Sequence, residues 1–214
     1  NTAVGTRSMQ CNTTADFNTA MGSCALFANT TGTKGVAIGS GALDANTTAN
    51  ENTAVGYESL TTNTTGGGLT ALGEGSLACN TTGSSNTAVG RSALCANTTG
   101  AQSVAVGQNS LLANTEGHST VALGYEALAA NTTAAYNVAI GHRSLKTNTT
   151  GSFNVAVGRQ ALCKNTTATQ NTAVGTSVLF SNTTGANNTG LGVSALYNNT
   201  TAANNTAVGT NALG

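Results

Sequence analysis

Apolar and polar positions recur along the whole chain with a period of seventeen residues. Rows that start at residues 1, 18, 35, 52, 69, 86, 103, 120, 137, 154, 171, 188 and 205 align without a gap. A fixed period without insertions is typical of solenoids, in which each repeat forms one coil that stacks on its neighbours. The pattern therefore predicts an all-β fold over residues 1–214, a single parallel β-solenoid (β-roll) domain of about 12.5 coils.

The first five places of each row predict a short strand. Place 1 is usually Asn, place 2 is Thr or Val, place 3 is Ala except at Gly190, place 4 is aliphatic and place 5 is always Gly. Alternation puts places 2 and 4 on one face of the strand. Because β-branched residues favour a pleated, buried surface, we expect places 2 and 4 inside and the Ala ladder of place 3 outside. The invariant Gly predicts a corner with positive φ, or a close approach of another backbone.

The next places predict a turn followed by the core. Places 6 and 7 vary freely, which is typical of a turn that faces solvent, and place 8 is small. Place 9 is Leu in every row except at Met9. Each buried Leu contributes about 1.5–3 kcal/mol, so this column predicts the core seam. With two strands and two corners per coil and about 4.8 Å between coils, the chain would form a rod on the order of 60 Å long.

An Asn-Thr-Thr triplet fills places 12–14 of every complete row except at Asn114-Thr115-Glu116. The triplet is an N-glycosylation sequon, so a sugar could stand on almost every coil. Alternatively, stacked Asn amides form a ladder between parallel coils. The ladder also explains why the Thr at place 13, which a sequon leaves free, never varies. Both interpretations stay open, and the candidate glycosylation sites are Asn12, Asn29, Asn46, Asn63, Asn80, Asn97, Asn131, Asn148, Asn165, Asn182 and Asn199.

Aromatic residues pair on neighbouring coils. Tyr136 and Phe153 share place 17, and Phe180 and Tyr197 share place 10. These four residues are the candidate ligand contacts, for a sugar or a protein receptor. The alternative is that each pair stacks on itself and stiffens a corner of the coil.

Composition narrows the function classes. Seven basic and seven acidic residues leave a net charge of 0, without the basic stripe that nucleic-acid binding requires. No apolar run approaches the roughly 18 residues that span a bilayer. The histidines His118 and His142 occupy different places, and the glycine run at residues 66–68 lacks the Lys-Ser/Thr of a phosphate loop. The five cysteines show no zinc-ligand spacing, so the sequence predicts no enzymatic activity, no metal and no cofactor.

Rows with Val at place 2, such as Gly35-Val-Ala-Ile-Gly39 and Asn137-Val-Ala-Ile-Gly141, resemble the head repeat of YadA-like trimeric autotransporter adhesins. The Asn-Thr-Ala-Val-Gly rows resemble repeats of predicted tail fibres and large surface proteins of bacteria and viruses. The resemblance covers the entire chain. It implies a left-handed parallel β-roll, three chains packed side by side about a fibre axis, and an aliphatic pair of each strand inside its own roll.

We therefore expect a structural, rod-like segment of an extracellular trimeric fibre or adhesin on a cell or virion surface. Its expected partners are copies of itself, as a homotrimer or end-to-end fibril, and a host-surface glycan or protein. One alternative is a self-assembling, glycan-coated extracellular fibril. Another is an ice-binding solenoid, although the two recurrent threonines are adjacent and should point to opposite faces.

Overall fold

The computed structural model describes all residues, Asn1–Gly214. It contains thirteen strands of three residues each and no helix. Each strand occupies places 2–4 of one row, so the predicted all-β parallel solenoid with a 17-residue repeat is confirmed. The strands are β1 (Thr2–Val4), β2 (Thr19–Met21), β3 (Val36–Ile38), β4 (Thr53–Val55), β5 (Thr70–Leu72), β6 (Thr87–Val89), β7 (Val104–Val106), β8 (Val121–Leu123), β9 (Val138–Ile140), β10 (Val155–Val157), β11 (Thr172–Val174), β12 (Thr189–Leu191) and β13 (Thr206–Val208). The structure has no helix with the length and apolarity that crossing a membrane requires.

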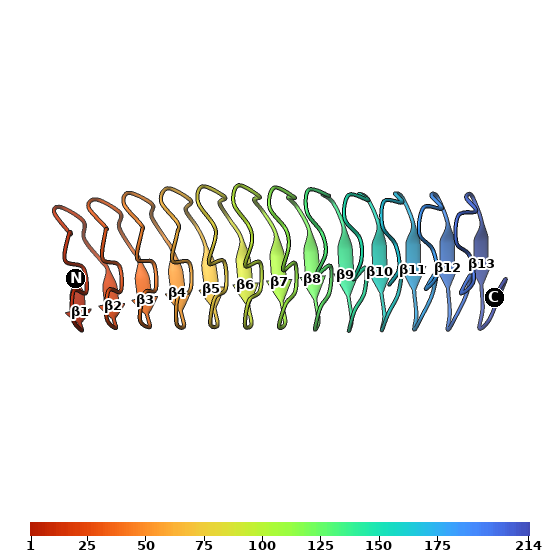
Figure 1. Ribbon diagram of the computed structural model, residues 1–214, viewed down its shortest axis with the longest axis horizontal. Helices are drawn as coiled ribbons and strands as arrows, with labels where there is room; N and C mark the ends of the chain where they lie inside the picture. Colours follow the sequence, from red (N-terminus) through yellow and green to blue (C-terminus); the bar gives the residue numbers. More distant parts are fainter. The chain divides into compact units, whose positions relative to one another are not determined.

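The chain divides into two compact units, Asn1–Ser103 with β1–β6 and Val104–Gly214 with β7–β13. Within each unit, consecutive strands pair in parallel (Figure 1). Each paired strand residue lies opposite the one seventeen positions later, as with Ala54 and Ala71 in the first unit. Equivalent side chains therefore stack in columns along each unit.

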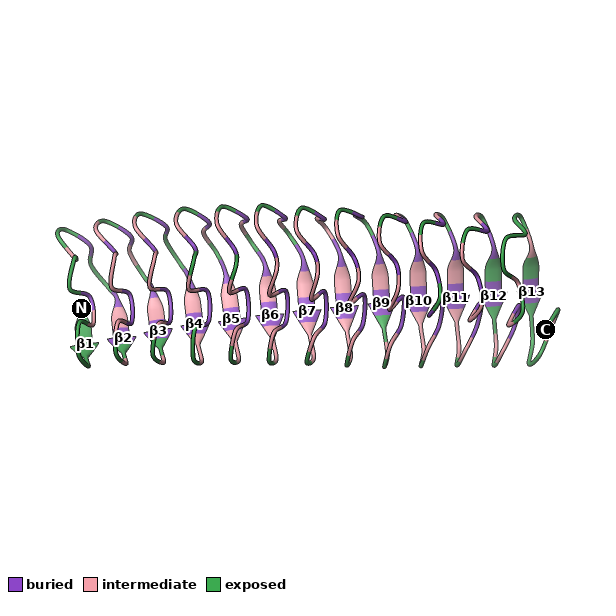
Figure 2. Cartoon of the chain, viewed as in Figure 1, coloured by how far each residue is buried: buried purple, intermediate pink, exposed green.

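The two faces of each strand are the reverse of what the sequence pattern predicted. Place 3 is buried in β2–β13, whereas places 2 and 4 keep part of their surface exposed in every strand (Figure 2). The reason is space, because place 3 lies against the small residue of place 8. The row that lacks Ala at place 3 follows the row with the largest residue at place 8, and a β-carbon on Gly190 would overlap the Val178 side chain. The interior of a coil therefore admits only a methyl group at this point.

Leu at place 9 forms the core seam, as predicted. The residue at this place is buried in every coil from Met9 to Leu196 and exposed only at Leu213 in the last row. These leucines have left-handed backbone conformations, with φ of 55° at Leu60 and 51° at Leu128. This conformation costs roughly 1–2 kcal/mol per residue, which the burial of a Leu side chain offsets.

The prediction of two strands per coil is wrong, because only places 2–4 form a strand. Places 6–11 form a turn, with positive φ at place 7 (50° at Glu58) and at place 9, and β-strands do not accommodate positive φ. Backbone hydrogen bonds still join successive coils here, as from Leu60 N–H to the Ser76 oxygen at 2.9 Å. Place 6 is exposed in every coil, as predicted for a solvent-facing turn, whereas place 7 is partly buried in most coils.

The invariant Gly at place 5 meets both conditions that the sequence predicted. Gly73 has a φ of 130°, which residues with a side chain rarely adopt. A β-carbon on Gly73 would also lie 2.7 Å from the carbonyl oxygen of Gly90 in the next coil. Any other residue at this place would separate the coils.

Candidate functional site

The asparagines of the Asn-Thr-Thr triplet lie inside the coils. Asn80 donates from Nδ2 to Oδ1 of Asn63 at 2.8 Å and to the Gly83 carbonyl oxygen at 3.0 Å. Nine of the eleven candidate glycosylation sites are buried in this way, and Asn12 and Asn199 are partly exposed. At the buried sites a glycan on Nδ2 would replace a hydrogen that this ladder uses and would put the sugar inside the coil. The ladder and the sugar therefore exclude each other there.

The two threonines of the triplet have different surroundings. The place 13 hydroxyl donates to the carbonyl oxygen of the same place in the next coil, as from Thr64 Oγ1 to Thr81 at 3.1 Å. This bond explains why place 13 never varies. The threonine at place 14, such as Thr65, is exposed in every coil that has it. The column of threonines at place 14 therefore faces outward.

A second asparagine ladder, at place 1, was missed by sequence reasoning. Asn52 donates from Nδ2 to the Gly66 carbonyl oxygen at 2.9 Å, and the same oxygen accepts from Asn63 at 2.9 Å. Oδ1 of Asn52 accepts the backbone N–H of Leu69 in the next coil at 3.0 Å. Bonds of this kind join the first and fifteenth places in most coils that begin with Asn, as at Asn137 and Asn154. The frequent Asn at place 1 was the signal that could have revealed them.

The exposed side of the strands in each unit, which we call the outer face and define as places 2 and 4 of its coils, carries a column of aliphatic side chains at place 4. Place 4 is aliphatic throughout, and Met21 is 49% exposed. In β7–β10 place 2 is also Val, so eight aliphatic side chains lie together there. Monomeric proteins rarely expose contiguous apolar patches larger than a few hundred Å². The outer face is therefore a candidate interface.

The four predicted ligand contacts form two separate stacked pairs. The rings of Tyr136 and Phe153 are 5.0 Å apart and 12° from parallel, and those of Phe180 and Tyr197 are 5.1 Å apart and 6° from parallel. His118 meets Tyr136 edge-on at 5.0 Å. Each ring of a pair covers one face of its partner, which is the stacking that the alternative predicts.

An ion cluster on places 7 and 10 of the second unit was also missed. Arg143 Nε and Lys146 Nζ each lie 2.8 Å from Oε2 of Glu126, whose side chain is only 17% exposed. The hydrogen bond from Lys146, helped by the one from Arg143, lowers the pKa of Glu126 to about 2. The arginine guanidinium also lies 5.9 Å from the Tyr125 ring centre. The two basic residues follow the glutamate by 17 and 20 residues, which is one coil and one coil plus three residues. These spacings were the signal in the sequence for this cluster.

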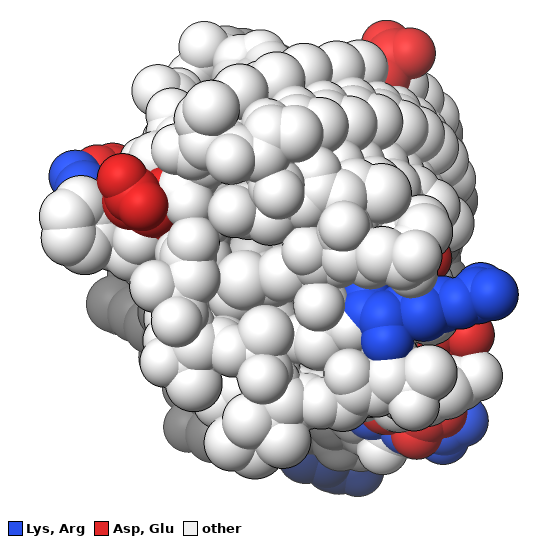
Figure 3. Space-filling view, turned by 90° about the vertical axis from the view of Figure 1, so that its left-hand side faces the viewer, with Lys and Arg blue, Asp and Glu red and all other residues white.

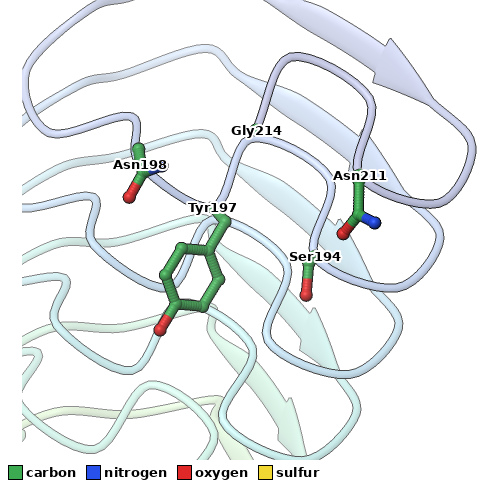
Figure 4. Close-up of a pocket in the computed structure, with 5 residues that line it drawn as sticks. All are labelled: Ser194, Tyr197, Asn198, Asn211 and Gly214. Carbon is green, nitrogen blue, oxygen red and sulfur yellow. The ribbon is translucent and has the colours of Figure 1, made fainter.

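Sites for catalysis or metal binding are sparse. A hollow at the last turn is lined by Ser194, Tyr197, Asn198, Asn211 and Gly214, a set without Asp, Glu, His, Lys, Arg or Cys (Figure 4). No three His, Cys, Asp or Glu side chains gather where they could hold a metal ion. All five cysteines are free. In the end-on view of Figure 3, most of the visible surface is uncharged.

Comparison with models of known protein families, with curated proteins and with solved structures finds no match for this chain.

Proposed function

We propose that this chain is a structural segment of an extracellular fibre or adhesin, on a cell or virion surface, in which three copies pack through their outer faces. The observation that carries the proposal is the partly exposed aliphatic residue at place 4 of every strand. A column of this kind stabilises nothing inside its own coil, and covering it with an identical column removes apolar surface from water.

The repeat makes such packing self-complementary. All copies have the same 17-residue period, so an apolar column of one copy matches that of another along its length. The number three and the left-handed roll come from the resemblance of the Val-containing rows to YadA-like adhesin heads. The reversed strand faces strengthen the case for association, because the exposed columns contain Val, Ile and Leu and not only the methyl groups of Ala.

The role of such a segment is length and display. Each coil repeats the same interior ladders of Asn and Thr, so the backbone is tied to the next coil at several points. Places 6 and 17, by contrast, vary from coil to coil and are mostly exposed. The constant places support the scaffold, and the variable places are available for display.

The proposal is tested by placing charge on the outer face. The triple variant Leu123→Lys, Ile140→Lys and Val157→Lys puts a cation at place 4 of three consecutive coils. The matched control is Thr133→Lys, Thr150→Lys and Thr167→Lys, which adds the same charge to the same coils at the exposed place 14. Sedimentation velocity should show a trimer for the control and a 20.9 kDa monomer for the outer-face variant. Equal native masses for the two variants would contradict the proposal.

The outward rank of threonines favours ice binding as a second candidate. Six coils of the first unit and five of the second present an exposed Thr at place 14. Within each unit the spacing between coils is about 4.8 Å. The place 14 triple variant described above interrupts this rank. If the rank binds ice, the unmodified chain shows thermal hysteresis and this variant loses it. Absence of thermal hysteresis in the unmodified chain excludes this candidate.

A further inference from the structure

Positive charge is concentrated in two consecutive coils of the second unit. Four of the seven basic residues, Arg143, Lys146, Arg159 and Lys164, lie within residues 137–170. All four occupy places 6–11, on the turn side of the coil. No Asp or Glu follows Glu126 in the sequence. The turn side of these coils therefore has a surplus of positive charge.

Two of these residues contact the same acidic side chain, and the repeat places the other two on the following coil. Arg143, at place 7, and Lys146, at place 10, both bind the same oxygen of Glu126, so these two places meet. Lys164 lies on the following coil, where its backbone N–H donates to the Phe180 oxygen at 3.1 Å. Arg159 stands in the same column as His142, one coil further on.

Aromatic rings flank and orient the cations. Tyr125 and His142 stack at 5.4 Å, and Arg143 lies over Tyr125. Lys164 Nζ lies 5.0 Å from the ring centre of Phe180. Contacts of this type restrict the positions of long basic side chains. The basic–aromatic patch, as we call it, consists of Tyr125, His142, Arg143, Lys146, Arg159, Lys164 and Phe180.

The charges of the patch are only partly neutralised. Glu126 is the one carboxylate in contact with it, and this group binds Arg143 and Lys146. Arg159 and Lys164 form no ion pair with an acidic residue. Both are exposed. The two residues are therefore cations that a ligand can reach.

We propose that the basic–aromatic patch binds a linear anionic polysaccharide through its sulfate or carboxylate groups. Guanidinium and ammonium groups form short, charge-assisted hydrogen bonds with such anions. Neighbouring Thr and Asn side chains on places 6 and 11, such as Thr176 and Asn198, can bind sugar hydroxyls, and ring edges offer apolar contact. The local charge is too small and too short for the continuous basic stripe that a nucleic acid requires.

This inference deepens the proposed adhesive role, but it does not depend on trimer formation, because places 6–11 lie away from the outer face. Failure of either proposal can therefore be recognised separately. The native mass of each variant reports on the assembly, and ligand retention reports on the patch.

The test uses the full chain and three probes: dextran sulfate, neutral dextran and a single-stranded oligonucleotide. The patch variant is Arg159→Thr with Lys164→Ser, which installs the residues that Thr176 and Ser181 supply at the same places of the next coil. The control variant is Lys34→Ser with Arg91→Ser, which removes the same charge from the first unit and installs the residues found at Ser85 and Ser40. Both variants use side chains that the repeat already accepts.

We expect the unmodified chain and the control to bind dextran sulfate in a salt-dependent manner, with no binding to neutral dextran. The patch variant should bind dextran sulfate roughly tenfold more weakly for each cation removed. Lack of dextran sulfate binding by the unmodified chain, or equal losses in the two variants, would overturn the assignment. Oligonucleotide binding as strong as dextran sulfate binding would also overturn it, in favour of a nucleic-acid site.

Discussion

Gly190 packs directly against Val178. A β-carbon on Gly190 would overlap Cγ1 of the valine, and it would also approach Cδ1 of Leu179 to 3.8 Å. In all other rows the residue at place 8 is Ala or Ser and the residue at place 3 is Ala. A larger residue at place 8 of one coil is therefore compensated by a smaller residue at place 3 of the next coil, so that the combined volume of the two side chains stays nearly constant.

This relationship predicts strong coupling between the two positions. Gly190→Ala alone should overpack the coil and lower the free energy of unfolding by about 1–3 kcal/mol. Val178→Ala alone should leave a cavity and cost about 2 kcal/mol. The double variant recreates the pair found in the other coils, so its stability should lie within about 1 kcal/mol of the unmodified chain. Urea unfolding of all four proteins measures the coupling, and additive losses would show that the two residues do not share a space.

A buried asparagine of the ladder should contribute several times more to the free energy of unfolding than an exposed asparagine does. Asn80→Ala leaves Oδ1 of Asn63 and the Gly83 oxygen without their buried donor, which should cost about 2–4 kcal/mol. Asn198→Ala is the control, because this residue is exposed and other coils have Ala at the same place. The control should change stability by less than about 0.5 kcal/mol. Thermal and urea unfolding provide the comparison, and similar losses for the two variants would contradict the role of the ladder.

The two threonines of one triplet should respond differently to the same substitution. Thr64→Val removes the hydroxyl that donates to Thr81 and leaves the side-chain shape unchanged, so stability should fall by about 1 kcal/mol. Thr65→Val alters an exposed side chain and should change stability by less than about 0.5 kcal/mol. Chemical unfolding measures both. A larger loss for Thr65→Val would show that place 14, not place 13, supports the coil.

Two glycines with positive φ should differ in their tolerance of Ala. Gly73→Ala would bring a β-carbon against the Gly90 carbonyl in a conformation that Ala avoids, so it should cost at least about 2 kcal/mol. Gly68→Ala also has positive φ, but the nearest atom lies 3.8 Å away and Ser85 holds a similar φ one coil further on. The second change should cost about 1 kcal/mol. Calorimetry can rank the two variants, and the reverse order would contradict the close packing of coils at place 5.

The ion cluster predicts a specific dependence of stability on pH. The folded pKa of Glu126, about 2, lies below its ordinary value of 4.5. The cluster therefore stabilises the fold fully at pH values above about 4.5, and this contribution is lost as the pH falls from about 4.5 to about 2. Glu126→Gln removes this contribution. Between these two pH values, the free energy of unfolding of the variant should therefore change by up to about 1 kcal/mol less than that of the unmodified chain. Parallel pH profiles of the two proteins would contradict the assignment.

Repetition within the chain made much of the scaffold predictable. Columns of Leu, Gly, Asn and Thr are places that the fold dictates, and the core seam, the corner at place 5 and the ladder at places 12 and 13 follow from them. The prediction of which strand face is buried was wrong, because β-branched residues suit a pleated backbone whether or not they are buried. The information was nevertheless present in the paired exceptions Val178 and Gly190, which indicate that places 8 and 3 touch.

Other features lie beyond what residue types reveal. A Leu with positive φ, as at Leu60, contradicts its ordinary backbone preference, so nothing in the residue itself predicts a turn in place of a second strand. The cluster of Glu126, Arg143 and Lys146 becomes visible only when rows are compared across coils, because its members are far apart in the chain and close in space. The stacked aromatic pairs follow from the same comparison of rows, because their members share a place on neighbouring coils.

The most direct test of the proposed assembly is the native mass of the purified chain, measured by sedimentation equilibrium over a wide range of concentrations. Association through the outer faces predicts a mass three times the 20.9 kDa of the chain, unchanged by treatment with an enzyme that removes N-glycans. A 20.9 kDa monomer at all concentrations, or an open-ended series of masses that decreases on deglycosylation, would contradict it.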